Sequence, residues 1–464
     1  MKTRRILSLI IALTVTLGFC FTQTALAVDS APDIGAEAAI LIDMDTGDVL
    51  YEKNSDFREY PASTTKMMTA ILAIENLDLT QDLIIDNEVA ATGGNRLGLV
   101  DGEIVNAKDV LYAMMVMSAN DGAVALAKAI AGSVADFCDM MNAKAKEIGC
   151  TGTHFVNPNG LHNDDHYSTA ADLAKIALYC MKNKTFREIV SLSSYTVPAT
   201  NASAARYVET TNLLLNDMTD KNMVTVNGEK RYCKYSGCIG IKTGQTPQAQ
   251  GCLASAAVRE GTRLLCVVLK SGALGRFADT ISLFDWGFSS YRKLAVMTKG
   301  QDLIEVKVKK GTINKLKVIS GSNIVITLPA EASDSSVRTE IRVADELLAP
   351  IKEGQVVGEI ALYSSGKEVA TYPALAASTI EEGGVLSRFG INDNIARYIW
   401  IALGVIVGGF LLSFGIAVIV RVRKIKRKRA LKAARLAEQQ AEKKKLEEAQ
   451  RRKWDDDYES RYKL

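Results

Sequence analysis

The sequence predicts an α/β chain of the α+β type, in which an antiparallel sheet is flanked by helices and followed by a small all-β domain. Helix-like apolar spacing fills residues 66–74, 110–117, 123–130 and 170–181. Strand-like runs fill residues 38–51 and 238–269, where short turns rich in Gly, Asp and Glu join neighbouring strands. After residue 300, short alternating runs separated by glycine and charged turns predict the second, all-β region.

Length and charge narrow the class of protein. The 464 residues suffice for two or three domains, and the net charge of +3 is unevenly spread. Residues 421–464 contain 17 Lys/Arg and 8 Asp/Glu, so this tail carries +9 and the rest of the chain carries −6. Because the body of the chain is acidic, it gives no sign of nucleic-acid binding, and no nucleic-acid partner is expected.

The first 27 residues are typical of a secretory signal peptide. Three Lys/Arg residues form its charged start, residues 6–21 form its apolar middle, and Ala-Leu-Ala at 25–27 is a small-x-small cleavage site. We therefore expect export and a mature chain that begins at Val28. The alternative is an uncleaved membrane anchor.

Seven cysteines follow the signal peptide, and most lie in contexts typical of small buried apolar side chains. The number is odd, so they do not all pair with one another. A disulfide between Cys233 and Cys238 could bridge a loop, but spacing alone does not establish pairing.

The first candidate for chemistry is the pair Ser63 and Lys66. Ser63 stands in the first turn of an expected helix, and Lys66 lies one turn further on the same face. A desolvated lysine can take the proton of a serine hydroxyl, and a helix N-terminus favours an oxyanion. The same Ser-x-x-Lys spacing recurs at 290–293, 364–367 and 460–463, so the pattern alone does not identify a catalytic pair.

A second candidate segment is Ser118-Ala119-Asn120, between two expected helices. It could be a simple connector, because Ser and Asn are common at helix ends. However, it is the only Ser-x-Asn in the chain, and it follows Ser63 by 55 residues. A second hydroxyl near Lys66 can relay protons, and an Asn amide can both donate to and accept from a substrate peptide.

A third candidate is the strand that contains Lys242, Thr243 and Gly244. Strand alternation places Lys242 and Gly244 on one face, opposite to the apolar residues Ile239 and Ile241. Because glycine has no side chain, a substrate backbone can lie close to the strand. The lysine cation can then pair with the carboxylate of that substrate. The alternative is an ordinary strand end with a solvated lysine.

Two histidines, His162 and His166, are four residues apart with Asp164 and Asp165 between them, so a metal site has to be considered. The segment follows Pro158 and Gly160 and has the composition of a loop, which disfavours a helix that would align the two imidazoles. We expect no metal and no cofactor.

Taken in order, Ser63-x-x-Lys66, Ser118-x-Asn120 and Lys242-Thr243-Gly244 form the trio found in penicillin-binding proteins and class A β-lactamases. The surrounding sequence resembles one family in particular, the low-molecular-mass D-alanyl-D-alanine carboxypeptidases, which are serine peptidases. Five segments carry this resemblance over roughly residues 34–390: NRLGLVDGE, MSANDGAVALA, THFVNPNGL, HYSTAADLA and IKTGQT.

The resemblance implies a β-lactamase/transpeptidase-like domain and an acyl-enzyme mechanism. Ser63, with Lys66 as base, would attack the bond between the two terminal D-alanines of peptidoglycan stem peptides, and β-lactam antibiotics would bind the same site. The backbone N–H groups of Ser63 and Gln245 would hold the oxyanion, and Ser118 would pass a proton to the leaving amine.

The same resemblance assigns substrate binding to five residues. Asn120 would orient the peptide, Lys242 and Thr243 would hold the terminal carboxylate, and Gly244 and Gln245 would line the strand beside it. One departure is Gln250, where the family usually has glycine; it lies on a strand beside the site and bears on substrate fit, not on the chemistry.

Three other functions remain open at this point. A β-lactamase would need a deacylating glutamate after Ser118, and the closest sequence, Glu209-Thr-Thr-Asn212, lies 91 residues further on in the wrong order. A zinc carboxypeptidase would have to use His162 and His166. A non-catalytic wall-binding anchor would use the same groove, but the intact motifs argue against it.

The C-terminal part predicts a membrane anchor. Residues 398–420 form a run of 23 residues without a charge, and the basic run 421–429 follows at once, which places the tail in the cytoplasm and the enzyme outside. This departs from relatives that end in an amphipathic surface helix. The expected parts are a signal peptide (1–27), a catalytic domain (28–295), a β domain (300–390), a transmembrane helix (398–420) and a basic, largely helical cytoplasmic tail (421–464).

Overall fold

The computed structural model describes residues 30–389, 391 and 393–462. The predicted signal peptide therefore lies outside the described residues. The chain divides into two compact units, each described by itself below. The first contains the described residues up to 297 together with 323–338, and the second contains residues 298–322 and the described residues from 339 onward.

The first unit is built on a five-stranded antiparallel sheet with the order β2-β1-β11-β10-β9. The strands are β1 (Ala38–Asp43), β2 (Val49–Lys53), β9 (Cys238–Thr246), β10 (Gln250–Arg259) and β11 (Thr262–Ser271). Each strand pairs antiparallel with the next, as Ile40 with Val267 on β1 and β11. These five strands confirm the predicted antiparallel sheet.

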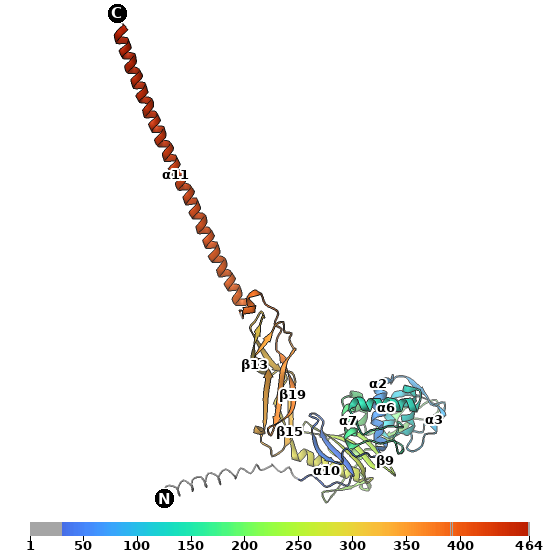
Figure 1. The fold of residues 1–464 in the computed structure, drawn as a ribbon. Helices are drawn as coiled ribbons and strands as arrows, with labels where there is room; N and C mark the ends of the chain where they lie inside the picture. Colours follow the sequence, from blue (N-terminus) through green and yellow to red (C-terminus); the bar gives the residue numbers. More distant parts are fainter. Residues whose placement is uncertain (1–29, 390, 392, 463–464) are drawn as a thin grey trace, which may run out of the picture. The chain divides into compact units, whose positions relative to one another are not determined.

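Helices cover both faces of this sheet, because the central strands carry apolar side chains on both sides. Val267 and Leu265 face one apolar core with α2 (Lys66–Asn76), whereas Val268 and Cys266 face a second core with α10 (Gly275–Ser290). In Figure 1, α10 lies on the side of the sheet opposite to α2, α6 and α7. The remaining helices are α3 (Asn87–Ala90), α4 (Ala107–Val116), α5 (Asn120–Ala131), α6 (Val134–Ile148), α7 (Ala170–Cys180), α8 (Lys184–Val190), α9 (Leu213–Asn216), η1 (Ala62–Thr65) and η2 (Asp220–Asn222).

The observed elements extend the expected ones. Helix α5 begins three residues earlier than its apolar spacing suggested, so Asn120 is its first residue. Helix α6 was not predicted, because buried residues such as Phe137 and Met141 alternate with many exposed polar ones; Ser133 caps its start. Small strand pairs complete the unit: β3 (Asp82–Ile84) with β4 (Ile104–Asn106), β5 (Ser194–Val197) with β6 (Arg206–Glu209), β7 (Val224–Val226) with β8 (Glu229–Arg231), and β12 (Tyr291–Met297) with β15 (Ile324–Pro329).

All seven cysteines among the described residues are free thiols. The possible Cys233–Cys238 disulfide is therefore wrong. The two side chains make separate contacts: Cys233 Sγ lies 2.9 Å from the Asn222 carbonyl, and Cys238 Sγ lies 3.7 Å from Ser255 Oγ.

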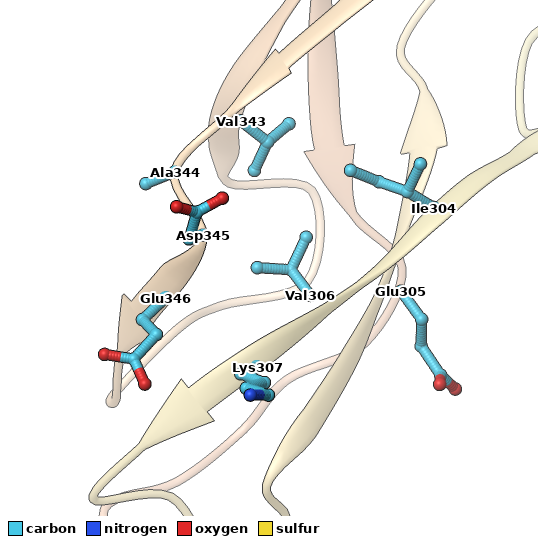
Figure 2. Close-up of a pocket in the computed structure, with 8 residues that line it drawn as sticks. All are labelled: Ile304, Glu305, Val306, Lys307, Val343, Ala344, Asp345 and Glu346. Carbon is cyan, nitrogen blue, oxygen red and sulfur yellow. The ribbon is translucent and has the colours of Figure 1, made fainter.

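The second unit confirms the predicted all-β domain. Its six-stranded sheet has the order β16-β18-β19-β14-β13-β17. The strands are β13 (Asp302–Lys309), β14 (Lys315–Ser320), β16 (Val337–Val343), β17 (Glu346–Leu348), β18 (Val356–Ser364) and β19 (Lys367–Ala376), with a short 3-10 turn at η4 (Val385–Phe389). The 3-10 turn η3 (Asp334–Ser336), directly before β16, belongs to the first unit. Strand β17 pairs only with the last three residues of β13. Figure 2 shows the resulting groove between β13 and the segment 343–346; none of the predicted site residues lines it.

Helix α11 (Asp393–Tyr462) is continuous from the predicted span into the basic tail. It is the one helix among the described residues that is long and apolar enough to cross a membrane, by length and composition, with a mean hydropathy of 2.6 over its most apolar window. Its apolar side chains between residues 398 and 420 are largely exposed, which is consistent with a membrane anchor.

Candidate active site

Ser63 lies in a tight turn directly before the helix that carries Lys66. The prediction placed Ser63 in the first turn of that helix; it occupies the 3-10 turn η1, and α2 begins at Lys66. Ala62 has a left-handed backbone (φ +46°), so the chain turns sharply as it enters η1. The Ser63 side chain is half-buried, and its Oγ reaches the pocket that holds the Lys66 amine.

The Lys66 amine is fully buried and contacts three oxygen atoms. Nζ lies 2.9 Å from Ser63 Oγ, 2.7 Å from Asn120 Oδ1 and 2.6 Å from the Asn159 carbonyl oxygen. Burial holds the pKa of Lys66 well below its usual range, and the nearby Lys242 cation lowers it further, whereas Asp121 opposes both effects. A buried lysine with a lowered pKa, in contact with a serine hydroxyl, is suited to act as a general base.

A second Ser-x-x-Lys shows why the spacing alone is not enough. Ser290 ends α10 and is buried, but Lys293 contacts the carboxylates of Asp43 and Asp45. The Ser290 hydroxyl makes no hydrogen bond within the described part of the chain. The Ser290 pair therefore lacks the serine–lysine contact that Ser63 and Lys66 make.

Ser118 and Asn120 lie at the turn between α4 and α5. Ser118 has a left-handed backbone (φ +69°) and a buried side chain, whose hydroxyl makes no hydrogen bond within the described part of the chain. Asn120 uses both ends of its amide: Oδ1 accepts from Lys66, and Nδ2 donates to the Gly93 carbonyl at 2.8 Å. Asn120 thus links Lys66 to the loop that precedes β4.

The loop at residues 157–161 supplies a group that the sequence did not single out. The Asn159 carbonyl contacts Lys66 Nζ, and Ser63 Oγ lies 3.4 Å from the same oxygen. Gly160 makes this approach possible, because a Cβ there would lie 1.9 Å from the Ala62 carbonyl oxygen. Backbone oxygens leave no residue-type signal, and only the Asn-Pro-Asn-Gly turn could have pointed to this loop.

Lys242, on β9, is almost fully buried. Its Nζ donates a hydrogen bond to the carbonyl oxygen of the next residue, Thr243, at 3.1 Å. Burial lowers the pKa of Lys242 to about 7, and the Arg276 guanidinium contributes to the shift. The Thr243 and Thr211 hydroxyls are 2.5 Å apart. Thr211 and Arg276 belong to segments in which sequence reasoning had assigned no role.

Gly244 lets β9 pass close to the nucleophile. A Cβ at position 244 would lie 2.9 Å from the Pro61 carbonyl oxygen and 3.0 Å from the Ser63 nitrogen. The next residue, Gln245, accepts a hydrogen bond from Arg276 Nη1 at 2.9 Å through its side chain. The strand therefore runs beside the turn that presents the Ser63 N–H, which is the arrangement an oxyanion site requires.

Gln250 occupies the first position of β10 with a left-handed backbone (φ +52°). Glycine adopts this conformation without strain, which fits the expectation that the resembled family has glycine here. The departure is accommodated at a strand end where the side chain is exposed.

His166 is buried, and both of its ring nitrogens are hydrogen-bonded. Nδ1 accepts from the Val156 N–H at 3.1 Å, so Nε2 carries the proton and donates to Thr65 Oγ1 at 2.8 Å. Burial lowers the pKa of His166 to about 3. His162 instead packs edge-on against Tyr60. Among the described residues there is no group of three or more His, Cys, Asp or Glu side chains placed to hold a metal ion.

The fold and this geometry together place a serine hydroxyl against a buried lysine amine, an arrangement suited to a serine hydrolase. Similarity to known proteins identifies the family to which the chain belongs. The family model described as D-alanyl-D-alanine carboxypeptidase matches residues 25–273, and the model for the C-terminal domain of penicillin-binding protein 5 matches residues 291–382. The chain belongs to the D-alanyl-D-alanine carboxypeptidase family of low-molecular-mass penicillin-binding proteins.

Individual relatives agree with this assignment. The chain is 33% identical over 358 residues to the D-alanyl-D-alanine carboxypeptidase DacF of Bacillus subtilis, covering 76% of this chain and 87% of the relative. It is 28% identical to DacC of Escherichia coli, covering 80% and 91%. Its fold matches the crystal structure of penicillin-binding protein 5 from Haemophilus influenzae with a TM-score of 0.64 and 27% identity, covering 76% and 99%. The alternatives of a β-lactamase and of a non-catalytic anchor are not favoured.

Proposed function

We propose that this protein removes the terminal D-alanine from peptidoglycan stem peptides through an acyl-enzyme formed on Ser63. The observation that carries the residue assignment is the 2.9 Å contact between the buried Lys66 amine and Ser63 Oγ. β-Lactam antibiotics would acylate the same hydroxyl. The family assignment supports the reaction class, and the contact supports Ser63 as the nucleophile and Lys66 as its base.

In the proposed reaction, neutral Lys66 takes the Ser63 proton as Oγ attacks the carbonyl carbon of the penultimate D-alanine. The N–H groups of Ser63 and Gln245 would stabilise the resulting oxyanion. The carbon–nitrogen bond then breaks, and Ser118 gives its hydroxyl proton to the departing amine of the terminal D-alanine while it takes the proton from Lys66, which becomes neutral again. Water hydrolyses the Ser63 ester, with Lys66 again available as base.

Substrate recognition would rest on Asn120 and on residues of β9. Protonated Lys242, with the Thr243 hydroxyl, would pair the terminal carboxylate, and Asn120 would orient the peptide while it holds Lys66. Gly244 and Gln245 would let the substrate backbone lie along β9.

The pKa of Lys242 gives a pH-dependent prediction. Because free Lys242 has a pKa of about 7, its protonated fraction falls as the pH rises through 7, and capture of a carboxylate should weaken above that pH. We expect the second-order acylation rate with benzylpenicillin, relative to that with its methyl ester, to fall between about pH 7 and pH 9. Stopped-flow acylation of the soluble domain measures both. Parallel pH profiles for the acid and the ester would contradict the assignment of Lys242.

We further propose the topology in which residues 398–420 span the membrane, with the catalytic domain outside and residues 421–464 in the cytoplasm. The exposed apolar stretch of α11 and the basic run after it support this orientation. The signal peptide (1–27) and the domains 28–295 and 300–390 complete the proposed organisation.

Protease added to intact, wall-stripped cells tests this topology. It should digest epitopes of the catalytic domain and spare a tag on the tail, and carbonate should fail to extract the protein. As a matched form, a chain truncated before residue 398 should be secreted and active. Extraction of the full-length protein by carbonate, or cleavage of the tail tag from outside, would overturn the single-span arrangement.

A further inference from the structure

Asp121 follows Asn120 in α5, and its carboxylate is completely buried. Oδ1 accepts from the N–H groups of Leu97 and Gly122, both at 2.9 Å, and Oδ2 accepts from those of Gly98 at 2.8 Å and Leu99 at 3.0 Å. No Lys, Arg or His in the described part of the chain forms an ion pair with it. Four backbone donors and the N-terminal end of α5 therefore compensate this buried charge.

Three of these donors are consecutive residues of one loop. The same loop contacts Asn120 at two points upstream: the Asn120 N–H donates to the Asn95 carbonyl at 2.7 Å, and its side-chain amide donates to the Gly93 carbonyl. Gly94 lies between them with φ +78°, where a Cβ would come within 2.5 Å of Asn120 Nδ2. Loop 93–99 is thus attached to the start of α5 by Asp121 at one end and wraps around Asn120 at the other.

We propose that Asp121 is a positioning residue for acylation, which anchors loop 93–99 so that the loop holds Asn120 Oδ1 against the Lys66 amine. The inference rests on the proposed role of Lys66 as base. Asp121 touches neither the nucleophile nor the substrate-binding strand, and it acts through Asn120.

The charge of Asp121 gives this role a second, measurable effect. Among the described residues, the charged and titratable groups that interact with Lys66 are Lys242 of β9, Asp121 of α5 and His166 before α7. The Cys180 thiol of α7 contacts the carbonyl of the next residue along α2, Met67. His166 is neutral near pH 7, and the Cys180 thiol is protonated because burial raises its pKa well above its usual range. Asp121 is the one member of this set whose charge stabilises protonated Lys66.

The charge of Asp121 determines the direction in which the pH profile of acylation shifts. Acylation needs neutral Lys66, so its rate rises with pH through the pKa of Lys66. Asp121→Asn removes the negative charge, which lowers that pKa, and the rising limb of the acylation profile should move to lower pH. The amide also turns an N–H₂ toward backbone donors, which should displace the loop and Asn120. We expect the plateau rate of acylation to fall roughly 10- to 100-fold.

Asp172 provides a matched control. It is also buried in the first turn of a helix, α7, and accepts from the N–H groups of Thr151 and Gly152. Asp172→Asn should therefore lower Tm as Asp121→Asn does, but leave the acylation rate and its pH limb unchanged. Gly94→Ala disturbs the loop without removing a charge. It should lower the plateau rate of acylation and leave the rising limb of the pH profile at the wild-type position.

The experiment combines stopped-flow acylation by nitrocefin from pH 5 to 9 with hydrogen exchange of loop 93–99 in the wild type and these variants. The expected result is a limb shifted to lower pH and faster exchange at residues 97–99 in Asp121→Asn alone. Failure of wild-type acylation would refute the proposed function, but the exchange measurement still tests the anchor. Unchanged protection of residues 97–99, or an unshifted limb in an active Asp121→Asn protein, would overturn the inference.

Discussion

Ser63→Ala is expected to abolish covalent labelling by fluorescent penicillin. The ring-opened β-lactam is held as an ester on a hydroxyl, and Ser63 Oγ is the hydroxyl that contacts the buried Lys66 amine. Denaturing gels of labelled protein measure the effect directly. The loss should be complete, because without this oxygen no ester can form.

The second Ser-x-x-Lys supplies the control for this experiment. Ser290→Ala removes an equally spaced serine whose lysine contacts two carboxylates, and it should label like the wild type. Labelling that survives Ser63→Ala would remove the central assignment. Loss of labelling in Ser290→Ala, in a folded protein, would show that the assay follows stability and not the nucleophile.

Lys66→Arg is expected to lower the acylation rate by roughly 10³-fold or more, which corresponds to about 4 kcal/mol of activation free energy. Arginine keeps the positive charge but does not lose its proton at any pH used, so it cannot serve as the base. The guanidinium is also larger than the site that holds the amine. Stopped-flow acylation and Tm should be measured together, so that loss of the base is separated from loss of the fold.

Lys175→Arg is a suitable control, because Lys175 pairs with a buried carboxylate of α7 but is itself only half-buried. It should acylate at the wild-type rate. Near-normal acylation by Lys66→Arg would mean that the Ser63 proton leaves by another route, and Ser118 with Lys242 would be the next candidates.

Much of the fold follows from local sequence patterns. The buried strands β10 and β11 are apolar over most of their length and are separated by a Glu-Gly turn, so their pairing was predictable. Helix α7 has helix-like apolar spacing and begins after Thr169, which caps it. In contrast, the apolar residues of α6 are interrupted by many polar ones and do not form a continuous apolar face. Strands of three residues, such as β3 and β4, are too short to give a recognisable pattern.

The candidate site was predictable only where it depends on side-chain type. The order Ser63, Lys66, Ser118, Asn120 and Lys242 carries a recognisable pattern, and the structure brings Ser63, Lys66 and Asn120 into direct contact. The Asn159 carbonyl could not be predicted in the same way, because every residue has a carbonyl and only the folded turn aims this one at Lys66. The Cys233–Cys238 disulfide, which the spacing had left open, is not formed: both cysteines are free thiols.

The direct test of the account is release of D-alanine from diacetyl-Lys-D-Ala-D-Ala by the soluble domain, compared with Ser63→Ala. We expect the wild type to release one D-alanine per peptide, and the variant to release none above the uncatalysed background. A folded wild-type domain that binds penicillin but releases no D-alanine would contradict the carboxypeptidase function. Equal release by Ser63→Ala would contradict the acyl-enzyme mechanism.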